Sequence, residues 1–317
     1  MMGNNLVKIG EGSSGGKIIL IGEHSVVYGF PAIVMPFDAI KTKVFVYKSD
    51  NDEITIDCMY HKGLLKKGTN TILGLQQLVA YILKDFGLEE KNLHFIIESN
   101  IAAQRGLGSS AAVSVAMVKA LYNAFNKKLS KEKLIELAMY AEKIHHKNPS
   151  GVDVFAMVYQ KPIWYVKNQG FKPIAINLEG YLVVVDSGIH SQTRYAVNHV
   201  ARLKEAKKEK VESSFNTLGA LTTKALNLLE NNDIITLGGI LNEAQIELTK
   251  IEVSNKTISF LIDEVLESGA LGAKLTGGGM GGCIIALVES KESVAKITKR
   301  INDLGYNNVW SYRLKEL

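Results

Sequence analysis

Residues 106–112 read GLGSSAA and stand directly ahead of an apolar run with helical spacing that includes Val113, Val115 and Leu121. The first N–H groups of a helix have no intrahelical acceptor, so glycines and hydroxyl residues at a helix start leave several backbone donors directed at one point. The helix dipole also favours negative charge there. This segment therefore predicts a loop and a helix N-terminus that bind an anion.

The same loop also fits the G-x-G-x-x-G/A pattern of dinucleotide-binding proteins. That pattern needs a tight strand-to-helix turn, with an acidic residue at the end of the next strand ~20 residues later. Here residues 99–105 form an extended loop, and residues 125–130 read as a helix end and a turn. A dehydrogenase is therefore the outside alternative, and binding of a nicotinamide cofactor in preference to ATP would support it.

Two further glycine segments fit known nucleotide loops poorly. The match at 277–282 leads into the apolar segment CIIALV rather than into a helix, which excludes a dinucleotide turn. Gly16-Lys17 is followed by Ile18 where a Walker A loop requires Ser or Thr.

A plain capped helix with flexible glycines remains the structural alternative for the loop at 106–112.

Hydrophobic periodicity predicts a β-rich first half with helices and a mostly helical second half closed by a few strands. This order indicates an α+β fold with two lobes rather than a doubly wound parallel sheet. We place the boundary near residue 180, which gives domains at 1–180 and 181–317. The expected strands are 18–21, 42–47, 54–58, 95–97, 162–166, 181–185, 283–288 and 308–313, and the expected helices are 71–86, 110–126, 131–146, a long helical stretch over 193–267, and 291–303.

Composition limits the partners and the compartment. The 317 residues suit two domains, and the formal charge of +5 is small for this length. The basic segment RLKEAKKEK at 202–210 includes glutamates and no aromatic residues, so it reads as a solvated helix face rather than a nucleic-acid site. Two distant cysteines, no signal-peptide core and no apolar run of ~20 residues predict a cytoplasmic protein without a membrane partner.

Glu142 falls on or beside the buried face of the helix expected at 131–146. It stands four residues after Ala138 and eight after Leu134, both apolar. A buried carboxylate needs a cation. From the helix alone, His146 at i+4 is the preferred partner and Mg²⁺ the other candidate.

Asp153 and Lys17 each have an ordinary structural interpretation. Asp153 follows the helix-breaking segment NPSG at 148–151, where an acidic residue commonly caps the next helix, here 154–159. Lys17 opens the strand KIILIG, and a lysine at a strand start is usually solvated.

Three segments together resemble the conserved motifs of the GHMP kinases: KIILIGEHSVVYG at 17–29, GLGSSAA at 106–112 and KLTGGGMGG at 274–282. Within that superfamily the resemblance is closest to the mevalonate kinases, which AEKIHHKNPSGVD at 141–153 and DSGIHSQTR at 186–194 also resemble. It implies an N-terminal β-rich α/β lobe and a C-terminal ferredoxin-like helical and sheet lobe, with the active site in the cleft between them. Ala102 replaces a proline common in the family, and Gly278 and Met280 depart from its usual third motif.

The resemblance also implies the nucleotide and metal site. Ser110 and Glu142 would hold Mg²⁺, which reverses the preference for His146. The wall near the triphosphate would be shaped by Gly277, Gly278 and Gly279. The ATP phosphates would be cradled by Gly106, Leu107, Gly108, Ser109, Ser110 and Ala111.

For the acceptor, the resemblance implies Asp153 as the catalytic base, with Lys17 beside it. Glu23 and His24 would contact the acceptor, and Thr193 would contact the acceptor or the phosphate, although His24 also reads as a structural turn histidine. Lys167 is our candidate for binding the acceptor carboxylate, against the alternative of a surface lysine at a strand end.

The implied activity is transfer of phosphate from ATP to the primary hydroxyl of mevalonate in the isoprenoid pathway. Other GHMP kinase acceptors, namely phosphomevalonate, galactose and homoserine, are the alternatives. A catalytically silent metabolite-binding relative would lose the base or the lysine, and a decarboxylating relative would usually lack the arrangement of Glu142. The sequence leaves open whether the chain forms a homodimer.

Overall fold

The computed structural model describes residues 6–50, 52–89, 91–101, 104–145, 149–191 and 193–316. They form two compact units that interleave along the sequence. The first unit takes the described residues of Met1–Gly16, Ile40–Ala102 and Gly108–Tyr159, and the second takes those of Lys17–Ala39, Ala103–Leu107 and Gln160–Leu317. Strands β1 (Val7–Ile21) and β2 (Pro31–Lys48) contribute residues to both units. The division into domains at 1–180 and 181–317 stays a prediction.

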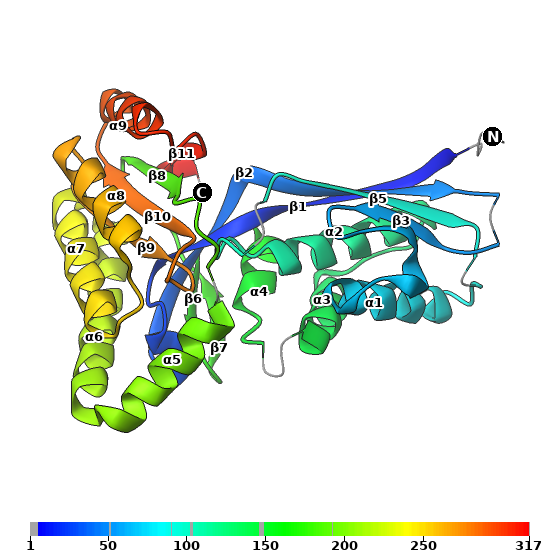
Figure 1. Cartoon of the computed structure of the whole chain (residues 1–317), viewed down its shortest axis with the longest axis horizontal. Coiled ribbons are helices and arrows are strands. Elements are labelled where there is room, and N and C mark those ends of the chain that lie inside the picture. Colours follow the sequence, from blue (N-terminus) through cyan, green and yellow to red (C-terminus); the bar gives the residue numbers. More distant parts are fainter. Residues whose placement is uncertain are drawn as a thin grey trace. The chain divides into compact units, whose positions relative to one another are not determined.

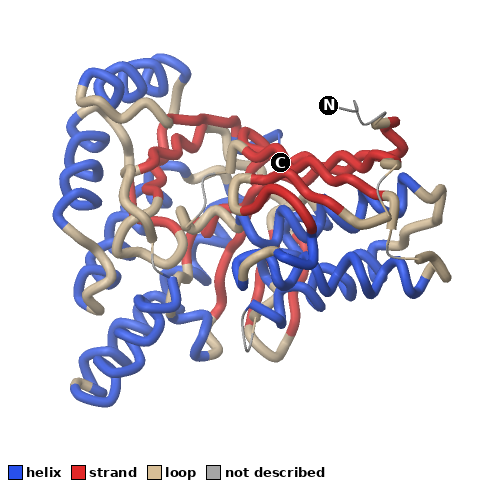
Figure 2. The backbone as a smooth tube through the Cα atoms, turned by 45° about the vertical axis from the view of Figure 1, so that its right-hand side comes forward, coloured by secondary structure: helices blue, strands red, loops and turns tan. Residues whose placement is uncertain are grey.

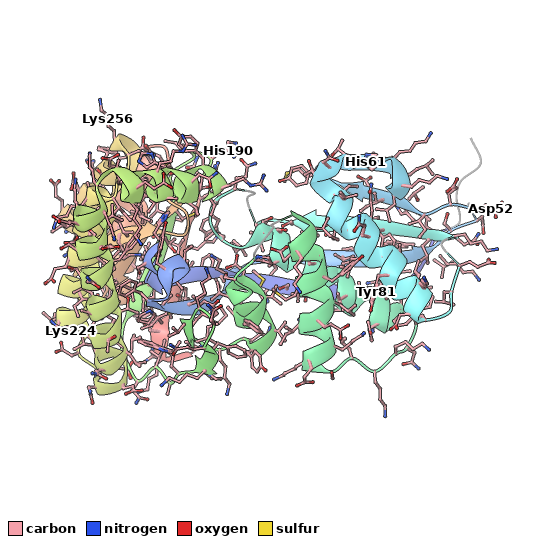
Figure 3. All side chains as sticks on the ribbon, turned by 90° about the horizontal axis from the view of Figure 1, so that it is seen from below. Asp52, His61, Tyr81, His190, Lys224 and Lys256 are labelled. Atoms are coloured by element: carbon pink, nitrogen blue, oxygen red, sulfur yellow. The ribbon has the colours of Figure 1, made fainter. Side chains whose placement is uncertain are left out.

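The first unit packs helices on one side of a sheet, as Figure 1 shows for α1, α2 and α3. The C-terminal part of β2 pairs antiparallel with β5, with Thr42 opposite Ser99, and β3 runs parallel to β5. Tyr81 and Tyr140 join α1 to α3 with their ring centroids 5.1 Å apart, and Tyr81 is labelled in Figure 3. The further elements are β3 (Thr55–Cys58), β4 (His61–Leu64), η2 (Leu65–Lys67), η3 (Asn70–Ile72), α1 (Leu73–Asp85), β5 (Leu93–Ser99), α2 (Ser109–Ala124), α3 (Lys131–His145) and α4 (Val152–Tyr159).

Strand β1 begins at Val7, eleven residues before the strand expected at 18–21. Glycine-rich sequence is normally a poor strand former, which is why the periodicity did not predict the first part. Here the glycines let the strand lie directly on α2. A Cβ at Gly12 would be 2.3 Å from the carbonyl oxygen of Ala116, and one at Gly10 would be 2.6 Å from Ala124 Cα.

The second unit contains a four-stranded antiparallel sheet in the order β11-β8-β10-β9, together with the helices of the C-terminal half. Figure 2 shows helices in blue and strands in red along the whole chain. The N-terminal part of β2 pairs with β6, which pairs with β7. Strands β4, β7 and β9 were not among the expected elements. The elements are η1 (Ser25–Tyr28), β6 (Ile163–Val166), β7 (Gly170–Pro173), β8 (Tyr181–Asp186), α5 (Thr193–Ala206), α6 (Lys208–Asn231), α7 (Ile234–Lys250), α8 (Lys256–Glu267), β9 (Gly272–Thr276), β10 (Cys283–Val288), α9 (Lys291–Asp303), β11 (Val309–Arg313) and η4 (Leu314–Glu316).

The helical stretch expected over 193–267 is divided into four helices, and side-chain caps mark the starts of the last two. Asn232 ends α6 in the left-handed conformation, and the Asp233 side chain accepts a hydrogen bond from Thr236 N at the start of α7. Asn255 caps α8 in the same way by accepting from Ile258 N. Such side chains satisfy helix donors while directing the chain into a new helix. Among the described residues, every helix is too short or too polar to cross a membrane.

Candidate functional site

The loop at 106–112 enters α2 as the sequence indicates. Gly106 and Gly108 both have a φ of 77°, a left-handed conformation that glycine adopts without strain. Gly108 is the N-cap of α2 and provides no side-chain acceptor. A glycine cap leaves the first N–H donors of a helix available to a ligand, and an anion is the ligand that the helix dipole favours.

Ser110 and Glu142 lie together in the first unit. Ser110 Oγ donates a hydrogen bond of 2.6 Å to Glu142 Oε1, and the Glu142 side chain on α3 is buried. The pKa of Glu142 is raised to about 7: burial is the main cause, the Ser110 hydrogen bond opposes it, and the charge of Asp153 adds to it. A hydroxyl and a buried carboxylate are hard oxygen donors of the kind that Mg²⁺ prefers, so the pair fits the implied metal. The alternative partner His146 lies outside the described residues.

Asp153 is the second residue of α4, which begins at Val152. It is therefore inside the helix and does not precede it as the cap of 154–159. Its side chain is partly exposed, and its charge acts on the buried Glu142. Two carboxylates of different exposure thus lie near each other on α3 and α4.

In the second unit, Lys17 is an interior residue of β1. The sequence interpretation of a solvated lysine at a strand start is wrong, because the strand begins ten residues earlier and the side chain is buried. Its backbone N–H donates to the carbonyl oxygen of Leu107 at 3.0 Å. This bond ties the first motif to the entry of the phosphate loop.

Glu23 follows β1 in the turn Gly22–Ser25 and forms an ion pair with Lys274 of β9. Both side chains have 0% exposure. Burial raises the pKa of the Glu23 carboxyl and lowers the pKa of the Lys274 ammonium, and each charge opposes the shift of the other. Lys274 was not among the sequence candidates. The available signal was a single lysine inside the otherwise apolar, fully buried strand GAKLT.

His24 is held in a rare conformation for a non-glycine residue, with a φ of 60°. Its Nε2 lies 2.9 Å from the carbonyl oxygen of Gly278. Because a carbonyl only accepts, Nε2 must carry the proton, and Nδ1 of the neutral ring is then an acceptor. Burial lowers the pKa of His24 to about 4, so the ring is neutral near pH 7.

Aromatic side chains support this turn from the helices of the second unit. The Tyr28 ring in η1 stacks on Phe215 of α6 at a centroid distance of 4.6 Å. Lys204 of α5 places its Nζ 4.8 Å from the centre of the Tyr28 ring. Lys167, our candidate for the acceptor carboxylate, donates from Nζ to the carbonyl oxygen of Val27 in η1 at 2.9 Å.

The glycine run at 277–282 makes close backbone contacts. A Cβ at Gly277 would be 2.8 Å from Gly106 Cα, and one at Gly278 would be 2.6 Å from Thr193 Oγ1 at the start of α5. The run therefore joins the phosphate-loop entry and Thr193 within the second unit. Met280 has a φ of 56° and donates its backbone N–H to Val253 at 2.7 Å.

The loop at 186–191 adds contacts that the sequence did not reveal. Arg105 forms an ion pair with the buried Asp186 at 2.8 Å and donates to the carbonyl oxygen of Gly188 at 3.0 Å. Ser187 and Ser191 donate to the carbonyl oxygens of Gly282 and Gly279. Their neighbour His190 is exposed and labelled in Figure 3. The loop thus links the phosphate-loop entry to the glycine run.

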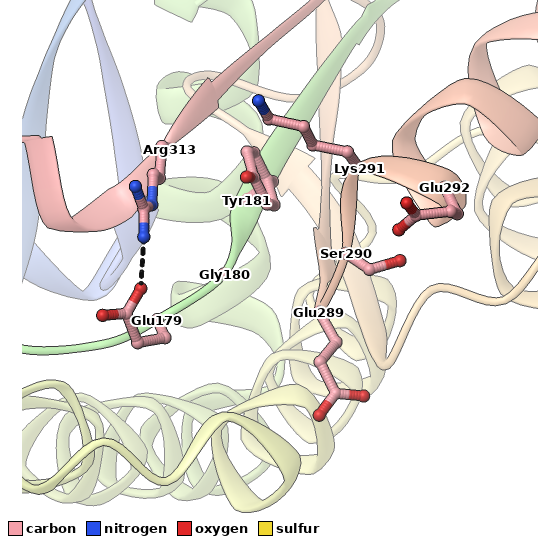
Figure 4. Close-up of a pocket in the computed structure, with 8 residues that line it drawn as sticks. All are labelled: Glu179, Gly180, Tyr181, Glu289, Ser290, Lys291, Glu292 and Arg313. Carbon is pink, nitrogen blue, oxygen red and sulfur yellow. Dashed lines mark hydrogen bonds and ion pairs between the residues drawn. The ribbon is translucent and has the colours of Figure 1, made fainter.

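A hollow of about 340 Å³ lies elsewhere in the second unit, at the start of β8 and of α9 (Figure 4). Among the residues that line it, Arg313 and Glu179 form an ion pair at 2.9 Å. As far as the described residues go, its lining contains no residue of the three motifs. The hollow therefore forms no part of the candidate site.

Comparison with known proteins gives the family. A family model described as "GHMP kinases N terminal domain" matches residues 70–161, and one described as "GHMP kinases C terminal" matches residues 225–307. The mevalonate kinase of Aeropyrum pernix is 33% identical over 288 residues, covering 88% of this chain and 89% of that protein.

Solved structures agree. The crystal structure of L. major mevalonate kinase in complex with R-mevalonate superposes with a TM-score of 0.84 at 28% identity, covering 98% of both chains. That of mevalonate kinase from methicillin-resistant Staphylococcus aureus gives a TM-score of 0.74 at 33% identity, covering 98% of this chain and 100% of the other. With likeness of this extent over nearly the whole length, the chain belongs to the mevalonate kinase family of the GHMP kinases.

Proposed function

We propose that this protein transfers the γ-phosphoryl group of ATP to the primary hydroxyl of (R)-mevalonate, forming 5-phosphomevalonate and ADP. Membership of the mevalonate kinase family supports the substrate. The observation that carries the chemistry is the buried Glu142, hydrogen-bonded to Ser110 of the phosphate loop and close to Asp153. A phosphate loop with two nearby carboxylates suits phosphoryl transfer that uses a metal ion.

The phosphate loop holds the nucleotide through the backbone N–H groups of residues 106–111 and the start of α2. Ser110 and Glu142 hold Mg²⁺, which when bound neutralises charge on the phosphate oxygens. Gly277, Gly278 and Gly279 bring the backbone close to the same nucleotide. Phosphoryl transfer passes through a loose transition state, so most of the catalytic effect comes from alignment and charge neutralisation.

Asp153 orients the attacking hydroxyl and accepts its proton. Lys17 stabilises negative charge on the reacting oxygens. The two residues thus have complementary roles: one removes a proton, and the other offsets the charge that develops.

The acceptor contacts are assigned from hydrogen-bonding capacity. His24 Nδ1 is an acceptor and suits a hydroxyl that donates. Thr193 at the start of α5 offers a hydroxyl, and Lys167 offers a cation for the carboxylate. The reaction is a step on the mevalonate route to isoprenoids, and the expected cytoplasmic location stays a prediction.

A coupled assay of ADP release tests the function. The purified protein is incubated with ATP, Mg²⁺ and one of four acceptors: (R)-mevalonate, phosphomevalonate, galactose or homoserine. We expect turnover with mevalonate alone. Faster turnover of another acceptor would assign the protein to a different GHMP kinase activity, and a lack of turnover with all four would refute the proposal.

A further inference from the structure

Lys274 and Glu23 form an ion pair that is completely enclosed. Lys274 lies on β9, three residues before the glycine run begins at Gly277, and Glu23 lies in the turn after β1. The Lys274 ammonium donates to Glu23 Oε1 and also to the carbonyl oxygen of Leu275 at 2.6 Å. Glu23 Oε2 is buried as well, and it has no hydrogen-bond partner among the described residues.

Stability does not account for charges at these positions. Desolvating two ions offsets much of their attraction, and replacing a buried pair by apolar residues of similar volume is often neutral or stabilising. The orphaned Oε2 makes this pair less favourable still. Its role is therefore better sought in what the pair holds in place.

Among the described residues, the pair is one of three side-chain connections between the end of β1 or the turn after it and β9 with its glycine run. Thr276 Oγ1 accepts from Ile19 N at 3.0 Å and donates to the Ile19 carbonyl oxygen at 2.9 Å. His24 Nε2 donates to the carbonyl oxygen of Gly278. The ion pair holds Glu23, the residue directly before His24, whose φ of 60° is rare for a non-glycine residue.

We infer that Lys274 is a positioning residue for the acceptor site: its ion pair with Glu23 fixes the turn Gly22–Ser25, so that His24 presents Nδ1 to the acceptor hydroxyl. The inference rests on the proposed function and refines it. Glu23 then acts by holding the turn through Lys274 and does not contact the acceptor. The glycine run that faces the nucleotide and the turn that faces the acceptor share one buried anchor.

Steady-state kinetics of Lys274→Met test this. We expect KM for (R)-mevalonate to rise about tenfold or more, the scale typical when a group that orients a ligand-contacting side chain is lost. KM for ATP should change much less. Ile285→Val is the matched control, because Ile285 is buried and directly opposite Lys274 in the sheet but carries no charge to pair with Glu23. It should leave both KM values near those of the wild type.

Two further variants separate positioning from general stability. Lys274→Arg keeps the charge and should recover part of the affinity for mevalonate. The neutral double variant Glu23→Gln/Lys274→Met should fold with an unfolding midpoint near that of the wild type, because both members of the pair are removed and neither is left as a charge without its partner. It should nevertheless keep the raised KM for mevalonate. Recovery of both the midpoint and KM in the double variant would overturn the inference, as would an equal rise in KM in Ile285→Val.

A readout independent of activity keeps this inference separate from the proposed function. Nitrogen-15 NMR of the histidine rings reports which nitrogen carries the proton, and His24 should show the Nε2–H form in the wild type. We expect this signature to be lost in the neutral double variant, and in Lys274→Met if that variant folds. An unchanged His24 signature would refute the positioning role, whereas failure of the wild type to phosphorylate mevalonate would refute the proposed function alone.

Discussion

Glu142 and Asp153 are carboxylates of the same unit in different surroundings. Glu142 is 7% exposed, and its pKa is raised to about 7, mainly by burial. Asp153 is partly exposed at the start of α4. Neighbouring acids in unlike environments commonly take different roles. Here the buried Glu142 suits binding of a metal ion, and the partly exposed Asp153 suits acceptance of a proton.

Asp153→Asn should retain ATP binding and lower kcat by roughly 10²–10⁴, the usual scale for a general base. The asparagine keeps the size of the side chain but cannot accept the proton. Glu292→Gln is a matched control, because Glu292 is also an acid in the first turn of a helix, α9. Steady-state kinetics measure both variants. More than about half of the wild-type kcat in Asp153→Asn would contradict the role of base, which should dominate the rate.

Glu142→Gln and Ser110→Ala should each raise the Mg²⁺ concentration needed for the half-maximal rate, since each removes or weakens an oxygen ligand. The measurement is a titration of initial rate against Mg²⁺ at saturating mevalonate. Ser114→Ala is the control on the same helix, because the Ser114 hydroxyl donates to the Ser110 carbonyl oxygen. If both site variants follow the wild-type curve, the metal site is elsewhere.

Lys17→Met should lower kcat about 10²-fold or more, because a charge that stabilises the transition state is lost. His24→Ala should instead act mainly on KM for mevalonate, since its hydrogen bond is made equally in the ground and transition states. Varying mevalonate and ATP separately distinguishes the two effects. A change confined to KM for ATP would assign the residue to the nucleotide.

The sequence does not predict those site residues whose role depends on a partner far away in the chain. Glu142, Asp153 and Lys17 stand in recognisable motifs, so their candidacy needed no coordinates. Lys274 is a lysine in an apolar strand, and its partner Glu23 is 251 residues away in the chain. A buried charge of this kind is interpretable only when the fold brings the opposite charge to it.

At the scale of elements, long helices were predictable and glycine-rich strands were not. α2, α3 and α9 lie within two residues of the ranges expected from apolar spacing and caps. The first part of β1 has no apolar alternation, because the face that lies on α2 consists of glycine rather than of large side chains. Packing against a backbone leaves no hydrophobic pattern to detect.

Gly12→Ala should therefore destabilise the protein, by about 1–3 kcal/mol as in other overpacked sites. The new methyl group would be 2.3 Å from a backbone oxygen of α2 and could not be accommodated by a side-chain rotation. Urea unfolding measures the effect. Gly239→Ala on α7 is the control: its Cβ would enter open space, and alanine should stabilise the helix by roughly 0.5–1 kcal/mol. Equal stability of Gly12→Ala and the wild type would contradict the packing of β1 on α2.

At the scale of the whole molecule, the two units draw on discontinuous parts of the chain. Composition and periodicity suggest where a pattern changes along the sequence, but they cannot show that residues 17–39 join the later half. That assignment depends on pairings such as Pro31 with Val166, which join distant segments. The α+β class was predictable, whereas the interleaving of the units required the structure.

The buried His24 should make folding sensitive to acid. Its pKa is about 4 in the folded protein against an ordinary value of 6.5, so the unfolded chain binds more protons between these values. The stabilisation is fully present above pH 6.5 and is lost as the pH falls towards 4, by about 3 kcal/mol in all. Urea unfolding at several pH values should show a flatter dependence in His24→Asn, since asparagine does not titrate in this pH range and is one of the side chains that most often adopt a positive φ. Parallel curves for the two proteins would contradict this account.

The contact between Gly106 and Gly277 limits how the protein can repair damage by mutation. A methyl group added at Gly277 would be 2.8 Å from Gly106 Cα, and the neighbour has no side chain that could be made smaller. In most packed pairs, a large substitution on one side can be offset by a small one on the other. A genetic screen for second-site suppressors of Gly277→Ala should therefore recover reversions, or changes elsewhere that move a whole loop, and no compensating substitution at position 106.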